Sequence, residues 1–217
     1  MRLRSTFAGL CLLITAGFAS EAVAAPSASP TATATASPTA TETFRSQHAK
    51  VSSLTRARAK TQKIEAAVDS LLDYHALAVE SLGGAKRFPD RCAPRCDQLE
   101  QLLTRLIREN YMRRVRTDKE HKVTFVGEET RGSSVRVKTN VRYETDGRPV
   151  IVEVVYVMHQ VDERWLVRDI ITDNVSLARN YKYEFNQLLK REGIDGLVAR
   201  LESKLSEQTM VAKAPSP

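Results

Sequence analysis

Few residues in this chain are of the types that act as catalysts or metal ligands, and their spacing matches no catalytic motif. The histidines are His48, His75, His121 and His159. A nucleophilic hydrolase needs a serine or cysteine beside a base. No G-x-S-x-G, H-E-x-x-H, P-loop or G-x-G-x-x-G motif occurs. His75 falls on an apolar helix face, where we expect a core residue rather than a catalyst. We therefore predict no catalytic residue and no metal site.

Two acidic residues and two cysteines are also of types that can do chemistry. Asp169 and Asp173 lie four residues apart at a predicted strand–helix junction, where we expect hydrogen bonding and helix capping. Cys92 and Cys96 have a spacing that is tight for a disulfide in a regular helix, since i and i+4 Cβ atoms lie about 5–6 Å apart. However, Pro89 and Pro94 indicate a loop. A Cys92–Cys96 disulfide and two free thiols both remain open, and no second pair completes a zinc site.

The amino-terminal residues have the pattern of a secretory signal peptide. Arg2 and Arg4 precede an uncharged apolar run, and Ala22-Val23-Ala24 is a small-x-small cleavage signal. We expect the signal peptide to span residues 1–24. Residues 25–43 contain mainly Ala, Thr, Ser and Pro, a composition typical of a disordered linker. One folded domain is then expected over residues 44–208, followed by a flexible tail over residues 209–217.

The chain is basic, with 33 Lys and Arg against 26 Asp and Glu and a formal net charge of +7. Part of the excess is concentrated in a ten-residue stretch, at Arg113, Arg114, Arg116, Lys119 and Lys122. In an exported protein we expect no nucleic-acid partner. An anionic membrane surface or an acidic protein is one interpretation of this stretch. A solvated helix end, where cations favour the helix dipole, is the other.

Hydrophobic periodicity predicts helices, then strands, then helices. Apolar residues recur at three- and four-residue steps over 64–82 and 99–111, and again over 175–189 and 194–205, with Gly193 as a break. Between them, residues 135–143 alternate apolar and polar, and 150–158 form a near-continuous apolar run. With 121–126 and 165–171, these are four sequential strands joined by short turns. The predicted fold is α+β, a four-stranded antiparallel sheet with amino- and carboxyl-terminal helices.

Several segments resemble the MlaC (toluene-tolerance) family of periplasmic phospholipid-binding proteins. The most specific runs from Trp165 to Tyr181 (WLVRDIITDNVSLARNY), followed by Tyr183-Glu-Phe-Asn-Gln187 and by residues 192–202. Leu72-Asp-Tyr74, Ser81-Leu-Gly83 and residues 135–139 also fit, in order, so the resemblance spans about 64–206. The family often has a tryptophan soon after the Leu-Gly pair. Residues 85–96, with two prolines and two cysteines, depart from that pattern.

The resemblance implies a carrier, not an enzyme, located in the periplasm of a Gram-negative bacterium. Such a carrier holds phospholipid as cargo and needs no cofactor. Its implied partners are an inner-membrane MCE-type lipid-binding subunit of an ABC transporter and an outer-membrane lipoprotein/porin complex, and its role is to maintain outer-membrane lipid asymmetry. Two alternatives are a periplasmic adaptor with a solid core and an enzyme on the same α+β scaffold.

From this resemblance we expect the curved sheet and the helices to enclose an apolar pocket. The predicted lipid-contacting residues are Leu71, Tyr74, Leu82, Leu103, Leu106, Tyr111, Val137, Val141, Val154, Tyr156, Ile170, Val175 and Tyr181. Their aliphatic groups would cover acyl chains, and the tyrosine hydroxyls would form hydrogen bonds near the mouth.

Overall fold

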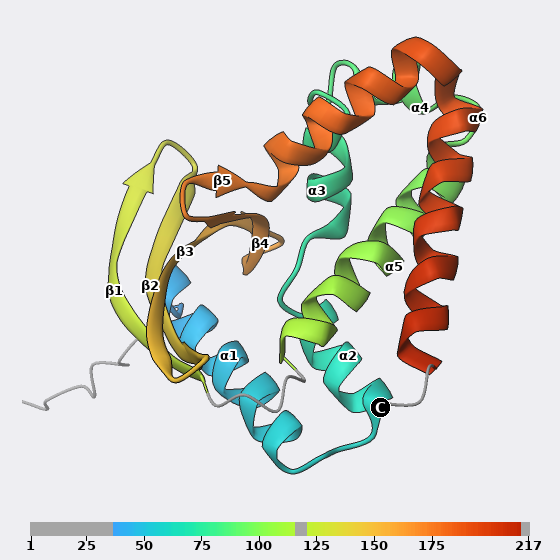
Figure 1. Cartoon of the computed structure of the whole chain (residues 1–217). Coiled ribbons are helices and arrows are strands. Elements are labelled where there is room, and N and C mark those ends of the chain that lie inside the picture. Colours follow the sequence, from blue (N-terminus) through green and yellow to red (C-terminus); the bar gives the residue numbers. More distant parts are fainter. Residues whose placement is uncertain (1–36, 116–120, 214–217) are drawn as a thin grey trace, which may run out of the picture. The chain divides into compact units, whose positions relative to one another are not determined.

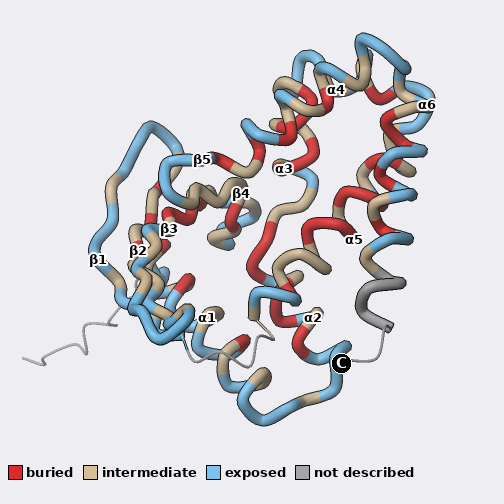
Figure 2. The backbone as a smooth tube through the Cα atoms, viewed as in Figure 1, coloured by how far each residue is buried: buried red, intermediate tan, exposed pale blue. Residues whose placement is uncertain are grey.

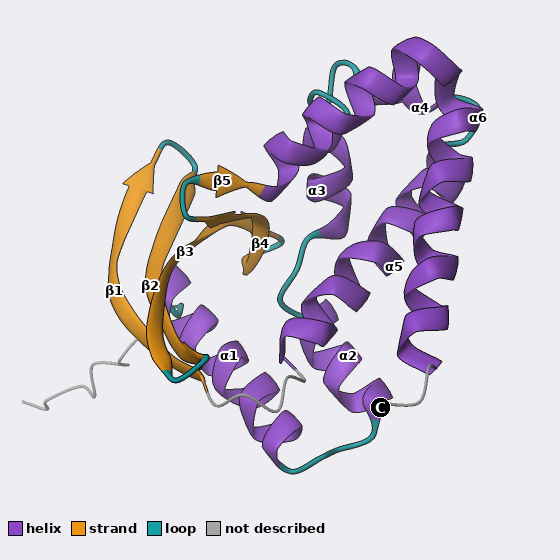
Figure 3. Ribbon diagram, in the orientation of Figure 1, coloured by secondary structure: helices purple, strands orange, loops and turns teal. Residues whose placement is uncertain are grey.

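The computed structural model describes residues 37–115 and 121–213, except for the side chains of residues 209–213. Within this part, helices and a five-stranded antiparallel sheet form an α+β fold, as predicted (Figures 1 and 3). The sheet is curved, and it has five strands rather than the predicted four. The predicted signal peptide over 1–24 and residues 25–36 of the predicted linker lie outside the described residues.

Helix α1 (Ala40–Arg56) begins inside the segment that we expected to be a linker as far as residue 43. Thr39 and Glu42 form a capping box, in which each side chain accepts a hydrogen bond from the backbone N–H of the other residue. Ala40 and Phe44 are then buried. This cap and the two buried side chains explain why the helix starts earlier than the composition suggested.

Helices α2 (Thr61–Asp69) and α3 (Tyr74–Ser81) share the apolar stripe predicted over residues 64–82. Asp73 separates them and caps α3 by accepting a hydrogen bond from the Ala76 N–H at 2.8 Å. The break resets the helical phase. His75 therefore lies on the exposed side of α3, where its Nδ1 is 3.0 Å from Glu100 Oε2. The expectation that His75 is a core residue was wrong.

A short helix, α4 (Phe88–Cys92), precedes the long helix α5 (Cys96–Val115). A disulfide bond joins Cys92 to Cys96 across the intervening loop. Arg91 Nη1 donates to the Leu82 carbonyl oxygen at 3.0 Å and to Asn186 Oδ1 at 2.5 Å. Through these two hydrogen bonds, the segment that departs from the family pattern, residues 85–96, links the end of α3 to the carboxyl-terminal helix.

The sheet order is β1-β2-β3-β4-β5, and each strand pairs with the next in sequence. The strands are β1 (His121–Arg131), β2 (Ser134–Thr145), β3 (Arg148–Val161), β4 (Arg164–Thr172) and β5 (Val175–Ser176). The two-residue turns at 146–147, 162–163 and 173–174 all have positive φ. Such turns match the twist of neighbouring antiparallel strands, so this part of the sheet is a meander of tight hairpins.

Helix α6 (Leu177–Lys213) follows β5 directly and changes direction at Gly193, where φ is 65°. The predicted break at Gly193 is thus confirmed. The helix continues to Lys213, five residues past the domain end expected at 208, because Pro215 is the first helix-breaking residue after Gly196. The last four residues of the predicted tail, 214–217, lie outside the described residues.

Backbone hydrogen bonds join the helical layer to the sheet at strand β4. Asp73 N–H donates to the Val167 carbonyl oxygen, and Val167 N–H donates to the Leu71 carbonyl oxygen, each at 2.9 Å. Leu72 and Val167 consequently form a parallel bridge. The link between α2 and α3 is therefore a single-bridge extension of the sheet.

Candidate functional site

One face of the sheet carries rows of mostly apolar side chains that the strand register places side by side. Val137, Tyr156 and Ile170 form one row across β2, β3 and β4. Phe125, Thr139 and Val154 form the next row, and a third consists of Val123, Val141 and Val152. Phe44 of α1 contacts this face, with its ring centroid 4.0 Å from that of Tyr156. The helices therefore cover the face that carries these rows.

Burial on this face decreases from one end of the strands to the other. Met158 and Val167, near the β3–β4 turn, are fully buried, and Tyr156 is 8% exposed. Val154 is half-buried, and so are Val141 and Val152, nearer the β2–β3 turn. Figure 2 shows the same change in colour along the strands. An apolar surface that the protein's own core covers only in part is what a hydrophobic ligand requires.

The residues predicted to line a pocket fall into three groups. Leu71, Leu82, Leu103, Leu106, Val137, Tyr156 and Tyr181 are buried. Five others are half-buried, namely Tyr74, Tyr111, Val141, Val154 and Ile170. Val175 lies in β5, not in a helix, and is 61% exposed. Its assignment to a helical stripe was wrong because the turn at 173–174 continues the sheet before α6 begins.

Four of these residues are tyrosines that come from four different elements. Tyr74 begins α3, Tyr111 lies on α5, Tyr156 on β3 and Tyr181 on α6. Tyr111 is close enough to Tyr156 and Tyr74 for their charges to affect its pKa. Tyr181 forms a hydrogen bond with Asn110, the residue before Tyr111. The fold thus gathers these four side chains, which we call the tyrosine cluster, beside the apolar face.

One hydroxyl of the tyrosine cluster is held by a charged pair. Tyr74 Oη donates to Asp69 Oδ1 at 2.8 Å, and Arg108 Nε donates to the same oxygen at 2.7 Å. The Arg108 guanidinium also lies 5.7 Å from the centre of the Tyr74 ring. Asp69 and Arg108 therefore satisfy each other and fix the Tyr74 ring, which leaves neither charge available for a reaction.

Burial raises the pKa of every hydroxyl in the tyrosine cluster. It raises the pKa of Tyr156 to about 12, while the positive charge of Arg114 opposes the shift. Burial likewise raises the pKa values of Tyr74, Tyr111 and Tyr181. These hydroxyls therefore stay protonated at neutral pH and act as hydrogen-bond donors, not as bases or nucleophiles.

The raised pKa of Tyr156 predicts a loss of stability at high pH. The folded protein keeps a proton that the unfolded chain releases near pH 10, so stability is complete below that pH and falls until about pH 12. Tyr156→Phe should make this fall shallower by about 1.4 kcal/mol per pH unit, measured by urea unfolding. The exposed Tyr183 supplies the control, Tyr183→Phe. An equal effect of both substitutions would contradict the prediction.

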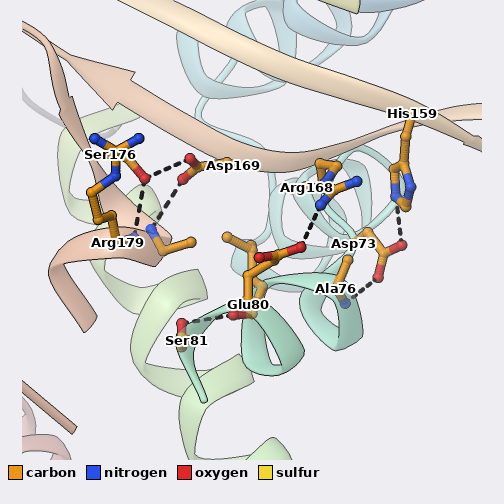
Figure 4. Close-up of polar contacts among 11 residues, drawn as sticks. Asp73, Ala76, Glu80, Ser81, His159, Arg168, Asp169, Ser176 and Arg179 are labelled. Carbon is orange, nitrogen blue, oxygen red and sulfur yellow. Dashed lines mark hydrogen bonds and ion pairs between the residues drawn. The ribbon is translucent and has the colours of Figure 1, made fainter. Parts of the chain in front are cut away.

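Polar contacts join α3 and α6 to the sheet beside this site (Figure 4). His159 Nε2 lies 2.8 Å from Asp73 Oδ2, and Arg168 pairs with Glu80. Asp169 accepts hydrogen bonds from the N–H groups of Ile170 and Ala178 and from Ser176 Oγ, at 2.9, 3.0 and 2.6 Å. The predicted capping role of Asp169 is confirmed. We call these three sets of contacts the polar junction.

His48, His75 and His159 contact aromatic or acidic groups, not nucleophiles. His48 packs against Phe44 and Phe125, and burial lowers its pKa. His159 belongs to the polar junction, and His75 pairs with Glu100. Within residues 37–115 and 121–213, no group of three or more His, Cys, Asp or Glu side chains is placed to hold a metal ion. These three histidines are therefore engaged in packing and pairing contacts.

Sequence reasoning missed three contributors to the site. Phe44 lay just inside the expected domain boundary but belonged to no predicted element, although the Thr39-x-x-Glu42 pattern indicates a helix start. Asp69 and Arg108 lie 39 residues apart and pair only through the packing of α2 on α5. No sequence pattern identifies such a pair.

Comparisons with known proteins give a family and several similar solved structures, one of which is described here. The family model described as MlaC protein matches residues 38–203. The structure is a phospholipid-binding protein from Ralstonia solanacearum in complex with a phospholipid. It is 20% identical, with a TM-score of 0.66, and the match covers 79% of this chain and 99% of that one. This likeness shows the fold. A search of curated proteins found no match.

Proposed function

Because this chain belongs to the MlaC protein family, whose model matches residues 38–203, we propose that it binds phospholipid and carries it without catalysing a reaction. The family membership that residues 165–202 indicated is therefore confirmed. The similar structure from Ralstonia solanacearum holds a phospholipid. Both findings support a lipid-binding role.

The observation that carries the proposal is the incompletely buried apolar face of the sheet. Val141, Val152 and Val154 face the helical side and are only half-buried. Next to them, Tyr156 and Ile170 continue the same surface toward the core. The proposed pocket lies between this face and α1, α5 and α6, and its wall includes the half-buried residues predicted from the sequence.

The size of the hydrophobic effect explains why such a surface is useful. Each methylene removed from water contributes about 0.8 kcal/mol, so a sixteen-carbon acyl chain costs on the order of 12 kcal/mol when exposed. An aliphatic wall removes that cost without any bond to the chain. The tyrosine hydroxyls can serve the polar part of the lipid, since they remain hydrogen-bond donors at neutral pH.

We further propose a place for this activity in the cell. The basic, signal-like amino terminus supports export, and the periplasm is the proposed compartment. None of the helices in the described part of the chain is long and apolar enough to cross a membrane. The proposed partners are an inner-membrane MCE-type subunit of an ABC transporter and an outer-membrane lipoprotein/porin complex, between which the protein would shuttle lipid.

Lipid analysis of the purified protein tests this function. The full chain, exported by a Gram-negative host and purified without detergent, should release diacyl phospholipid on organic extraction and should carry its mass in native mass spectrometry. We expect about one lipid per protein if the whole apolar face is used. A folded protein that is free of lipid, and that takes up none from vesicles, would instead favour an adaptor with a solid core.

A further inference from the structure

The last turns of α5 present three polar side chains on one side of the helix. Asn110, Tyr111 and Arg114 are spaced three and four residues apart, so they share one face. Asn110 bonds to Tyr181, and Tyr111 belongs to the tyrosine cluster. This face of α5 therefore points toward the proposed pocket, and Arg114 stands at its solvent end as an exposed residue.

Arg114 differs from the other arginines that touch this region. Arg108 is committed to Asp69, and Arg113 bonds to Asn110. No ion pair or hydrogen bond to Arg114 occurs among the described residues. Glu184, which like Asp69 acts on a tyrosine of the cluster, lies 3.7 Å from Lys204 Nζ and accepts from Asn180 Nδ2 at 3.2 Å. The Arg114 charge is thus left for another anion.

Two hydroxyls of the tyrosine cluster are also without a partner. Tyr74 Oη donates to Asp69, and Tyr181 bonds to Asn110. By contrast, no hydrogen bond to Tyr111 or Tyr156 is formed within the described part of the chain, although the Tyr156 side chain belongs to the core and is only 8% exposed. Neither hydroxyl oxygen is itself buried, because Thr43 Oγ1 is the one buried side-chain oxygen or nitrogen without a partner among the described residues. Both hydroxyls are therefore open to a ligand oxygen.

The unpaired arginine lies near one of these hydroxyls, that of Tyr156, and Tyr156 in turn lies near Tyr111. The positive charge of Arg114 lowers the pKa values of both Tyr156 and Tyr181, against the larger effect of burial. The charge of Arg114 therefore affects one side chain of β3 and one of α6. A cation and two phenol donors at the edge of an apolar surface match the polar part of a glycerophospholipid, which has one anionic phosphate and two ester carbonyls.

We propose that Arg114 binds the phosphate of the lipid, and that Tyr111 and Tyr156 donate hydrogen bonds to its ester oxygens. This inference rests on the proposed function and extends it. The protein selects a lipid through its phosphodiester, not only through its acyl chains. Phospholipids that differ beyond the phosphate are then bound alike, while a diacylglycerol with the same acyl chains is discriminated against.

A competition experiment tests this selectivity. Delipidated full-length protein is incubated with vesicles that contain equal amounts of phosphatidylglycerol and of diacylglycerol with the same acyl chains. The protein is then re-isolated, and both lipids are quantified by mass spectrometry. We expect the unmodified protein to favour phosphatidylglycerol by about tenfold or more, as a charge-assisted hydrogen bond allows.

Arg114→Gln should bring the two lipids to nearly equal occupancy. Arg105→Gln is the matched control, because Arg105 is exposed on the same helix and nine residues away, half a turn around the axis. Arg105→Gln should keep the full preference. Tyr156→Phe removes only the hydroxyl and should weaken retention of both lipids, since both carry ester groups. Thermal melting of each variant verifies that it is folded.

The outcomes separate this inference from the proposed function. If the unmodified protein binds neither lipid, the proposed function fails. If it binds both lipids equally, or if folded Arg114→Gln keeps the preference, lipid binding stands and the phosphate site is wrong. Inorganic phosphate alone is the last probe. Calorimetric binding of phosphate that depends on Arg114, together with equal binding of the two lipids, would assign the site to a free anion and overturn the lipid interpretation.

Discussion

Val154→Glu and Ile170→Glu should each reduce bound phospholipid by about tenfold or more in protein purified from the same host. Both side chains are half-buried and lie on the face of the sheet that the helices cover. A carboxylate placed against acyl chains loses its hydration without gaining a partner, which costs several kcal/mol. Water can solvate the charge only if the lipid leaves. The measurement is lipid extraction followed by quantification per mole of protein.

Two variants serve as controls for this result. Arg136→Glu places the same charge on the opposite face of β2, one residue from the buried Val137, and should keep its lipid. Val154→Leu keeps the wall apolar and should also retain lipid. If all four variants hold equal amounts of lipid, the proposed pocket is wrong. If the two glutamate variants do not fold, their lower melting temperature reveals it, and Val154→Ser provides a milder test of the same wall.

Asp169→Ala should destabilise the protein by about 3 kcal/mol, the largest stability effect that we expect from a polar residue here. One carboxylate accepts three hydrogen bonds, from the Ile170 and Ala178 N–H groups and from Ser176 Oγ. Hydrogen bonds to a charged group contribute roughly 1.5–3 kcal/mol each and do not add fully. The loss would separate the end of β4 from the start of α6. Urea unfolding at neutral pH measures it.

Smaller changes at the same place should have graded effects. Asp169→Asn keeps an acceptor oxygen and should cost about half as much. Ser176→Ala removes one of the three contacts and should cost about 1 kcal/mol. If Asp169→Ala, Asp169→Asn and Ser176→Ala were all as stable as the unmodified protein, the contacts at Asp169 would not hold this part of the polar junction together.

The hairpins could be predicted from the sequence because local signals agree. Val135 to Tyr143 alternate apolar and polar residues, and Asp146-Gly147 marks a turn that requires positive φ. The break at Gly193 has a similar local cause. Where an element depends on its neighbours, prediction failed. Two-residue β5 carries no period of its own and exists only by pairing with Ile171 and Thr172.

The site was predicted in part for the same reason. The apolar stripes and runs contain Tyr111, Tyr156 and Tyr181, and the family resemblance added Tyr74, but the convergence of the four side chains from α3, α5, β3 and α6 depends on tertiary packing. His75 was placed on the wrong face because Asp73 interrupts the stripe that a single continuous helix would have. Spacing reports which residues face inward within one element. It does not report which elements meet.

The parallel bridge between Leu72 and Val167 restricts where the protein can adapt to cargo of different size. Through it, the link between α2 and α3 is hydrogen-bonded to β4, so that border is fixed by backbone geometry. On the β1 side, the described contacts between helix and sheet are made by side chains. One of them is the hydrogen bond that Thr41 Oγ1 of α1 donates to Glu128 Oε2 of β1 at 2.5 Å. Rotamer changes there cost far less than breaking backbone pairs. We therefore expect longer or unsaturated acyl chains to be accommodated by side-chain rearrangement on the β1 side, while the backbone on the β4 side does not move.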